Sequence, residues 1–345
     1  MLWQSNNPFF EINYKKYILD NGLEVVLREN HDNPTVAVAI LYHVGSSREK
    51  LGKTGFAHLF EHLLFQRSEH VERNAFFYKI SDLGGDFNGG TWEDGTVYYE
   101  SVPNDALEKV LWMESDRMGF FINTVSEKGL ECEKDVVINE KRQMYDNRQY
   151  GHTSSVIRKA LYPSGHPYSW TVIGESSDIR RATLDDAREF YREWYNPNNA
   201  TISISGDFDS DEVLSLVKKY FGEIKSDSHK KQKNIVDIPV LTKEIRLVHE
   251  DKFANLPELT MVFPAPQQYS RDSYALSFLC ELLAVGKDSP LYKAIVEKNL
   301  APEVAMNVFS KEICGEIRLR IRAFSDIKLD DVYSAIKCAF DAFEK

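Results

Sequence analysis

The chain has 345 residues, of which 43% are hydrophobic, and carries a formal net charge of −11 at pH 7. This length and composition can fill two hydrophobic cores, whereas the acidic balance argues against a nucleic-acid partner, which needs a basic surface. No signal peptide is visible, and the longest apolar stretch, residues 36–44, is too short to cross a bilayer. We therefore expect a soluble protein without a membrane span, cytoplasmic by default or periplasmic if the chain is processed.

The first hundred residues predict strands and two helices. Asp20-Asn21-Gly22 separates two apolar runs, an arrangement typical of a hairpin between residues 17 and 29. The β-branched run 35–44 predicts a central strand. Helical spacing of apolar residues then predicts helices at 56–65 and 74–83.

The alternation of strands and helices continues to residue 221. The expected strands are 87–91, 96–102 and 200–205, and the expected helices are 105–121, 126–147, 183–195 and 210–221. Together these elements predict an α+β domain over residues 1–225. The polar stretch 226–234 predicts a linker, and residues 235–345 predict a second domain.

A weak internal repeat relates the two predicted domains. Strand 96–102 with helix 105–121 resembles the predicted strand 316–323 with helix 329–343. A long segment follows this helix in the first domain, whereas almost nothing follows it in the second. We therefore expect the second domain to be truncated.

The four cysteines, Cys132, Cys280, Cys314 and Cys338, lie far apart in the sequence and form no CxxC pair. Such spacing is typical neither of a disulfide framework nor of a thiolate zinc site. We expect buried free thiols.

The sequence His58-Leu59-Phe60-Glu61-His62 places two imidazoles four residues apart on the predicted helix 56–65. Side chains at this spacing share one face of a helix, so both rings can bind the same ion, and Glu61 stands beside them. The alternative is an ordinary amphipathic helix whose histidines make hydrogen bonds, because so short a pattern also arises by chance. The motif favours a hydrolytic zinc site.

A catalytic zinc site needs a third protein ligand, and the predicted helix 126–147 offers two candidates. Glu133 and Glu140 are seven residues apart and share a face, and Val136 and Val137 predict that this face turns toward the core. The alternative is a solvated charged helix, since charged residues surround both carboxylates. Two buried carboxylates require a cation, so the pattern favours a metal-binding face.

With these residues in view, the chain resembles the pitrilysin family of zinc peptidases, the inverzincins, in which the HxxEH order inverts the usual HExxH. The resemblance covers nearly all of the first predicted domain. The segments that carry it are LDNGLEVVLREN at 19–30, GFAHLFEHLLF at 55–65, GGDFNGGTWEDGTVYY at 84–99, EKDVVINEKR at 133–142, HPYSWTVIG at 166–174 and YNPNNATISISGDF at 195–208. It implies tandem homologous α/β sandwich domains of the pitrilysin or mitochondrial processing peptidase type.

The resemblance implies a role for each residue of the motif. It makes His58, His62 and Glu140 the ligands of a Zn²⁺ cofactor and Glu61 the general base. Glu133 joins Glu61 among the catalytic residues as a carboxylate that supports the ligands. The implied reaction is hydrolysis of peptides or unfolded polypeptide segments by zinc-activated water.

The segment Asn88, Gly89, Gly90 and Thr91 resembles the edge strand on which these peptidases pair an extended peptide substrate. Its composition also fits a hairpin strand weakened by glycine. The double glycine stands where the family usually has a single small residue, so the register of pairing is left open.

The second predicted domain departs from the family pattern. Family members carry an Arg and a Tyr, within R-E-K-x-L-x-Y, that stabilise the oxyanion and the substrate. Val296 and Pro302 stand at these positions here. We therefore expect a homologous second half or a partner subunit to supply the Arg and the Tyr. The alternative is a non-catalytic peptide-binding or assembly subunit that retains a zinc site.

Overall fold

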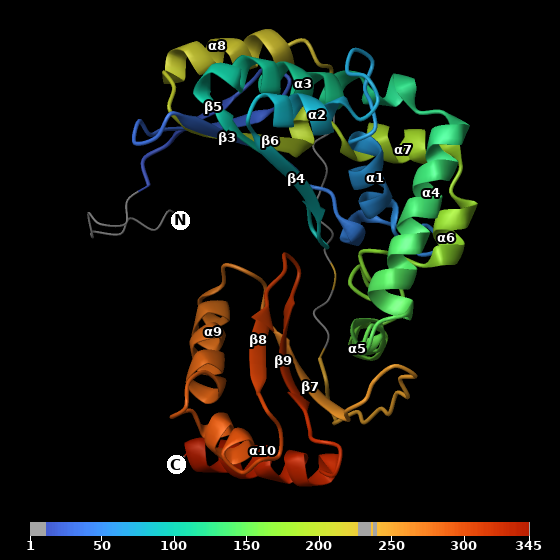
Figure 1. The fold of residues 1–345 in the computed structure, drawn as a ribbon, viewed down its shortest axis with the longest axis vertical. Helices are drawn as coiled ribbons and strands as arrows, with labels where there is room; N and C mark the ends of the chain where they lie inside the picture. Colours follow the sequence, from blue (N-terminus) through green and yellow to red (C-terminus); the bar gives the residue numbers. More distant parts are fainter. Residues whose placement is uncertain (1–11, 227–235, 237–239, 345) are drawn as a thin grey trace. The chain divides into compact units, whose positions relative to one another are not determined.

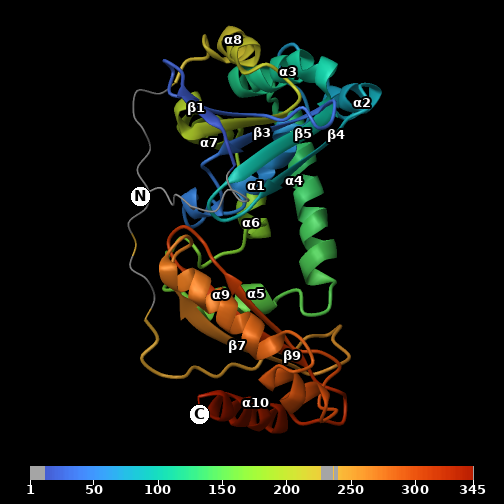
Figure 2. The same ribbon diagram turned by 90° about the vertical axis from the view of Figure 1, so that its left-hand side faces the viewer.

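The computed structural model describes residues 12–226, 236 and 240–344, and Figures 1 and 2 show the ribbon from two sides. The chain divides into two compact units. Unit 1 runs to Asn139 and resumes at Val172, and unit 2 comprises Glu140–Thr171 and the C-terminal stretch. Apart from Ser226, the predicted linker 226–234 lies outside the described residues.

Unit 1 is built on a six-stranded sheet with the strand order β1-β2-β6-β3-β5-β4 (Figure 1). Its strands are β1 (Lys15–Ile18), β2 (Glu24–Glu29), β3 (Thr35–Tyr42), β4 (Asp86–Thr91), β5 (Thr96–Pro103) and β6 (Ala200–Gly206). Neighbouring strands are antiparallel except β2 and β6, which are parallel. The β1–β2 hairpin turns where the sequence predicts, at Gly22, whose φ of +88° favours glycine.

The helices of unit 1 follow the predicted order, except that α6 was not predicted. They are α1 (Phe56–Leu64), α2 (Ala75–Asp82), α3 (Leu107–Phe120), α4 (Glu127–Lys141), α6 (Ser176–Arg181), α7 (Leu184–Trp194) and α8 (Ser210–Phe221). Figures 1 and 2 show α3 and α8 side by side. The predicted helix 126–147 is shorter than expected, because a π-helical turn, Arg142–Asp146, follows α4. Only the last two residues of α4 are grouped with unit 2, although the helix is continuous.

One face of the sheet in unit 1 is buried and the other is not. Val36, Val38 and Ile40 of β3 are at most 1% exposed, and the residues between them are exposed or half-buried. Side chains alternate across a strand, so this pattern shows a sheet covered on one side. Helix α1 packs against β4 and β5, and its Phe60 stacks on Tyr191 of α7 with ring centroids 6.4 Å apart.

A charged cluster lies inside the core of unit 1. Arg117 of α3 is fully buried, and its guanidinium lies 2.7 Å from the carboxylate of Glu114 and 3.6 Å from that of Glu100 on β5. The rings of Phe76 and Tyr98 lie 3.9 and 4.4 Å from the guanidinium carbon, within cation–π distance. Burial raises the pKa of Glu100 well above its ordinary value, and Glu114 raises it further. The raised pKa favours the neutral form of Glu100, and Glu114 is the nearer ion-pair partner of Arg117.

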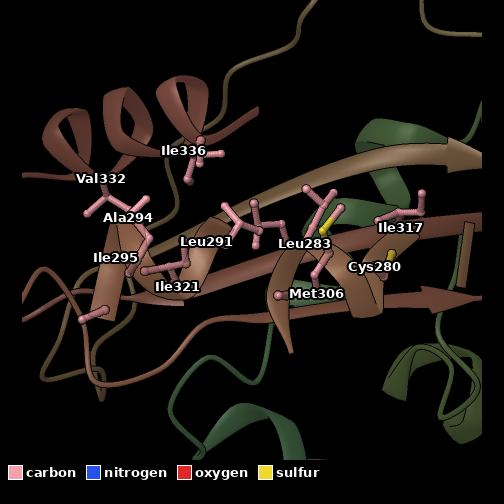
Figure 3. Close-up of a cluster of buried hydrophobic side chains, with 14 of the residues drawn as sticks. Cys280, Leu283, Leu291, Ala294, Ile295, Met306, Ile317, Ile321, Val332 and Ile336 are labelled. Atoms are coloured by element: carbon pink, nitrogen blue, oxygen red, sulfur yellow. The ribbon is translucent and has the colours of Figure 1, made fainter. Parts of the chain in front are cut away.

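Unit 2 contains a three-stranded antiparallel sheet with the order β7-β9-β8. Its elements are β7 (Glu258–Ala265), β8 (Ala305–Phe309), β9 (Gly315–Arg322), α5 (Thr153–Leu161), α9 (Arg271–Ala284), α10 (Leu329–Phe343) and a π-helical turn at Tyr292–Val296. Figure 3 shows Leu283 of α9, Ile295 of the turn, Ile321 of β9, and Val332 and Ile336 of α10 in its hydrophobic core. No helix within the described ranges combines the length and hydropathy needed to cross a bilayer.

The same succession of elements occurs in both units. In unit 1, β3 is followed by helices α1 and α2, the β4–β5 hairpin and helix α3. In unit 2, β7 is followed by α9 and the π-helical turn, the β8–β9 hairpin and α10. The strand order β3-β5-β4 matches β7-β9-β8. The repeat expected from the sequence corresponds to the pairs β5–α3 and β9–α10.

Strand β7 has one neighbour where β3 has two. β3 pairs with β5 and β6, whereas β7 pairs with β9 alone within the described residues. The stretch 244–250, which precedes β7 as β2 precedes β3, forms no strand. Its Ile245 and Leu247 are 49% and 59% exposed, whereas Val25 and Leu27 of β2 are 0% and 1% exposed. The second sheet is thus narrower than the first, as the prediction of a truncated domain requires.

The four cysteines are free, but they are not all buried. Cys280 and Cys314 are buried as predicted, whereas Cys132 and Cys338 are exposed. The prediction was wrong for this second pair, because both residues lie on the outer faces of amphipathic helices, α4 and α10.

Candidate metal centre

The loop before α1 fixes where this helix begins. Gly55 has a φ of +86°, and a Cβ there would lie 2.7 Å from the carbonyl oxygen of Ile173, so the position requires glycine. The Glu49 carboxylate accepts hydrogen bonds from the N–H groups of Gly55 and Ala57 at 2.9 and 2.8 Å. N–H groups of a first helical turn have no partner within the helix, so Glu49 stabilises the start of α1. The sequence does not indicate this role, because Glu49 lies outside the usual capping position.

His58, His62 and Glu140 each offer one ligand atom, and these three atoms lie within 4.8 Å of one another. The two imidazoles come from successive turns of α1, with ring centroids 4.8 Å apart, and Glu140 comes from the last turn of α4. No other group of this kind occurs in the part of the chain that the structure describes. Two imidazoles and one carboxylate suit a catalytic zinc ion, with a fourth position left for water. The residues present therefore fit zinc.

Glu133 lies beside this group. Its carboxylate is 3.9 Å from Nδ1 of His62, and its side chain is 5% exposed. Burial raises the pKa of Glu133, an effect that the charge on His62 partly opposes. At 3.9 Å the pair is an ion-pair contact rather than a hydrogen bond, in the place from which a carboxylate can orient the ring of a ligating histidine.

The face of α4 between Glu133 and Glu140 is only partly buried, whereas the sequence predicts that both of its valines lie in the core. Val137 is 1% exposed, but Val136 is 42% exposed, so the prediction of a core position was wrong for Val136. Consecutive residues on a helix differ by about 100° in direction, so the two valines cannot share one narrow buried stripe.

A hydrogen bond joins Glu61 to strand β4. The carboxylate of Glu61 accepts a hydrogen bond of 2.5 Å from the hydroxyl of Thr91, the last residue of β4. The sequence suggests that Thr91 belongs to the edge strand but not that it contacts Glu61, since no local pattern encodes the packing of β4 on α1. The candidate base is therefore joined directly to the candidate peptide-binding strand.

Asn88, Gly89 and Gly90 lie on β4, which forms one edge of the sheet and pairs only with β5 among the described strands. The two glycines differ in their surroundings. A Cβ on Gly89 would lie 2.9 Å from the ring of Phe65, whereas a Cβ on Gly90 would meet nothing within 4 Å. Gly89 therefore permits close packing of β4 on Phe65, and Gly90 leaves space open beside the strand.

Gly89→Ala is expected to destabilise the protein by about 1–3 kcal/mol, because the new methyl group forces Phe65 or β4 to shift. Gly90→Ala is the matched control and is expected to stay within about 0.5 kcal/mol of wild type. Both substitutions remove the same backbone freedom from the unfolded chain, so the difference between their urea midpoints isolates the contact. Equal midpoints would show that Phe65 does not constrain this strand.

Comparisons with known proteins identify the family of this chain. Residues 24–166 match the family model described as insulinase (peptidase family M16), and residues 181–345 match the peptidase M16 inactive domain. The chain is 31% identical over 292 residues to zinc protease PqqE of Helicobacter pylori, a match that covers 83% of this chain and 64% of the relative. It is 25% identical over 214 residues to the mitochondrial-processing peptidase subunit beta of Saccharomyces cerevisiae, covering 60% of this chain and 45% of that relative.

Solved structures show the same fold. The crystal structure of a protease from Helicobacter pylori matches with a TM-score of 0.85 and 28% identity, over 96% of this chain and 79% of that chain. The crystal structure of pitrilysin matches with a TM-score of 0.76 and 18% identity, over 96% of this chain and 36% of that chain. The chain spans less than two thirds of the length of these two curated relatives. The two family models together match most of its residues, and the chain therefore belongs to peptidase family M16.

Proposed function

We propose that this chain is the zinc-bearing part of a metalloendopeptidase that hydrolyses peptides or unfolded polypeptide segments. The observation that carries the proposal is the convergence of His58, His62 and Glu140 within 4.8 Å, with Glu61 on the same helix as the two imidazoles. The name zinc protease, borne by the relative from Helicobacter pylori, supports the same reaction class.

Each residue of the site has its own role in peptide hydrolysis. When bound, zinc polarises the scissile carbonyl and makes water nucleophilic near neutral pH. Glu61 takes a proton from the attacking water and passes it to the leaving amine. Glu133 keeps the ring of His62 in orientation. The edge of β4 that has no strand partner among the described residues, at Asn88–Thr91, pairs with the backbone of an extended peptide.

We further propose that a homologous half or a partner subunit completes the active site. The side chains of Val296 and Pro302 carry no hydrogen-bond donor, so they cannot stabilise an oxyanion as the Arg and Tyr of family members do. The complementing polypeptide would supply both groups.

Two homologous domains, residues 1–225 and 235–345 with a linker at 226–234, remain our proposal for the evolutionary division of the chain. The shared succession of strands and helices in the two units supports it. The compact units cut the chain differently, since Glu140–Thr171 is grouped with the C-terminal stretch.

A second candidate function is a non-catalytic peptide-binding or assembly subunit that retains zinc. Two observations favour it: residues 181–345 match a model described as an inactive domain, and Val296 and Pro302 replace the Arg and the Tyr. The presence of Glu61 beside the ligands favours the peptidase, because a purely structural metal site has no use for a base.

Zinc content and peptide cleavage, measured on the same preparation, test the proposal. We expect stoichiometric zinc in this chain alone. With an M16 polypeptide that carries the Arg and the Tyr added, we expect cleavage of a quenched fluorescent peptide library that a chelator abolishes and added zinc restores. The His62→Ala variant should lose zinc. The His152→Gln variant should keep it, because His152 is outside the proposed metal site and its side chain is 45% exposed. Bound zinc without cleavage, also after addition of an M16 polypeptide that carries the Arg and the Tyr, would favour the second candidate. Absence of zinc would refute the site.

A further inference from the structure

We propose that Thr91 is a positioning residue, whose hydroxyl holds the carboxylate of Glu61 in the orientation needed for proton transfer and ties it to strand β4. The role of Glu61 as base rests on the proposed function. The contact between the two side chains does not, because it belongs to the fold of unit 1.

The direction of the hydrogen bond follows from the neighbours of Thr91. Thr96 lies directly opposite Thr91 in the β4–β5 pairing, and its hydroxyl donates to the carbonyl oxygen of Val44 at 2.8 Å. Its only hydrogen is thereby engaged, so Thr96 cannot donate to Thr91, whose oxygen is 3.4 Å away. A carboxylate accepts hydrogen bonds and does not donate them. Thr91 therefore donates to Glu61, and the 2.5 Å separation is typical of a strong, charge-assisted bond.

Thr91 is itself held in place. The turn that follows it closes through a hydrogen bond of 3.0 Å from the N–H of Trp92 to the carbonyl oxygen of Gly95. The N–H of Ser47 donates to the carbonyl oxygen of Glu93 at 2.7 Å, which fixes this turn to the loop before α1. A donor on so constrained a backbone restricts the carboxylate that it binds.

This contact joins two parts of the site that have different tasks. Glu61 stands on α1 with two of the proposed metal ligands. Thr91 ends β4, whose outer edge has no partner among the described strands and is proposed to pair with substrate. A peptide pairing along β4 therefore engages the same strand that orients the base. Displacement of a catalytic group by about 1 Å can reduce a rate about 100-fold, so loss of this restraint should affect turnover more than substrate binding.

Kinetics of Thr91→Val and Thr91→Ser test the proposal. Valine keeps the shape and removes the hydroxyl, so we expect kcat to fall about 10- to 100-fold with little change in KM or in zinc content. Serine keeps the hydroxyl and should restore most of the activity. Thr35→Val, at an exposed threonine that begins β3, is the control and should behave as wild type. A rise in KM at unchanged kcat would overturn the proposal and make Thr91 a substrate contact.

A double-mutant cycle decides the question without relying on cleavage. Thermal unfolding of the full chain, with zinc present, is compared for wild type, Thr91→Val, Glu61→Ala and the double variant. We expect the shifts in Tm to be non-additive, because either single change removes the same hydrogen bond. Additive shifts would overturn the proposal. If the wild type cleaves no peptide even with an M16 polypeptide that carries the Arg and the Tyr added, the proposed function fails, and the cycle still reports whether Thr91 holds Glu61.

Discussion

Glu61→Gln is expected to abolish peptide cleavage while leaving zinc bound. The amide has the shape of the carboxylate and still accepts the hydrogen bond from Thr91, but it cannot take a proton from water. General acid–base catalysis contributes about 10²- to 10⁴-fold, so kcat/KM should fall by about that factor. The measurement pairs kcat/KM for a quenched peptide with metal analysis of the same sample.

The control for this experiment is Glu127→Gln, at an exposed glutamate in the first turn of α4, which should leave both activity and zinc unchanged. Cleavage retained in Glu61→Gln would remove Glu61 from its assigned role as base. Loss of zinc together with activity would instead place Glu61 among the ligands.

Arg117→Leu is expected to lower the free energy of unfolding by about 3–5 kcal/mol, the second large effect. The substitution leaves the carboxylate of Glu114 buried without its cation, and removal of one partner from a buried ion pair has a cost of this size. It also removes the cation that Phe76 and Tyr98 contact. Urea unfolding followed by circular dichroism measures the change.

Glu100→Gln is the matched comparison within the same cluster. Because burial raises the pKa of Glu100 and so favours its uncharged form, which the amide resembles, we expect stability within about 1 kcal/mol of wild type near neutral pH. A loss as large as that of Arg117→Leu would show that Glu100 is ionised in the folded protein.

Glu100→Gln also tests how the free energy of unfolding depends on pH. In the unfolded chain Glu100 ionises near its ordinary pKa of 4.5, whereas in the folded protein it stays protonated well above this value. The folded state thus binds the extra proton, so the contribution of Glu100 to stability falls as pH rises above 4.5. Glu100→Gln should remove this contribution, and its unfolding free energy should decline less with pH than that of wild type.

The parts of the site that could be predicted from the sequence are those encoded locally. The spacing of His58 and His62 places them on one face of α1, and the observed helix ends at Leu64, one residue before the predicted end. The grouping of Glu140 with these histidines depends on how α4 packs on α1. The spacing on the predicted helix offered both Glu133 and Glu140, and only the family resemblance chose Glu140. The π-helical turn after Lys141 was missed, because no local pattern distinguishes it from α-helix.

Contacts between distant segments could not be predicted. Glu114 and Arg117 have the i, i+3 spacing of an ordinary surface ion pair, and nothing nearby shows that both are fully buried. Glu49 and Thr91 likewise act on α1 from a preceding loop and from a neighbouring strand. In each case the decisive information is which elements pack together, which periodicity does not carry.

The unpaired edge of β7 has a consequence for the protein in solution. Along this edge, backbone N–H and C=O groups lack a strand partner within the described residues, and exposed backbone of this kind is a template for pairing with another chain. The central residues Leu259–Phe263 carry no charge and no proline, the two features that commonly guard such edges. A short, uncharged segment of high β-propensity is prone to aggregate. We therefore expect a strand that covers this edge of β7 to reduce aggregation of the protein at high concentration.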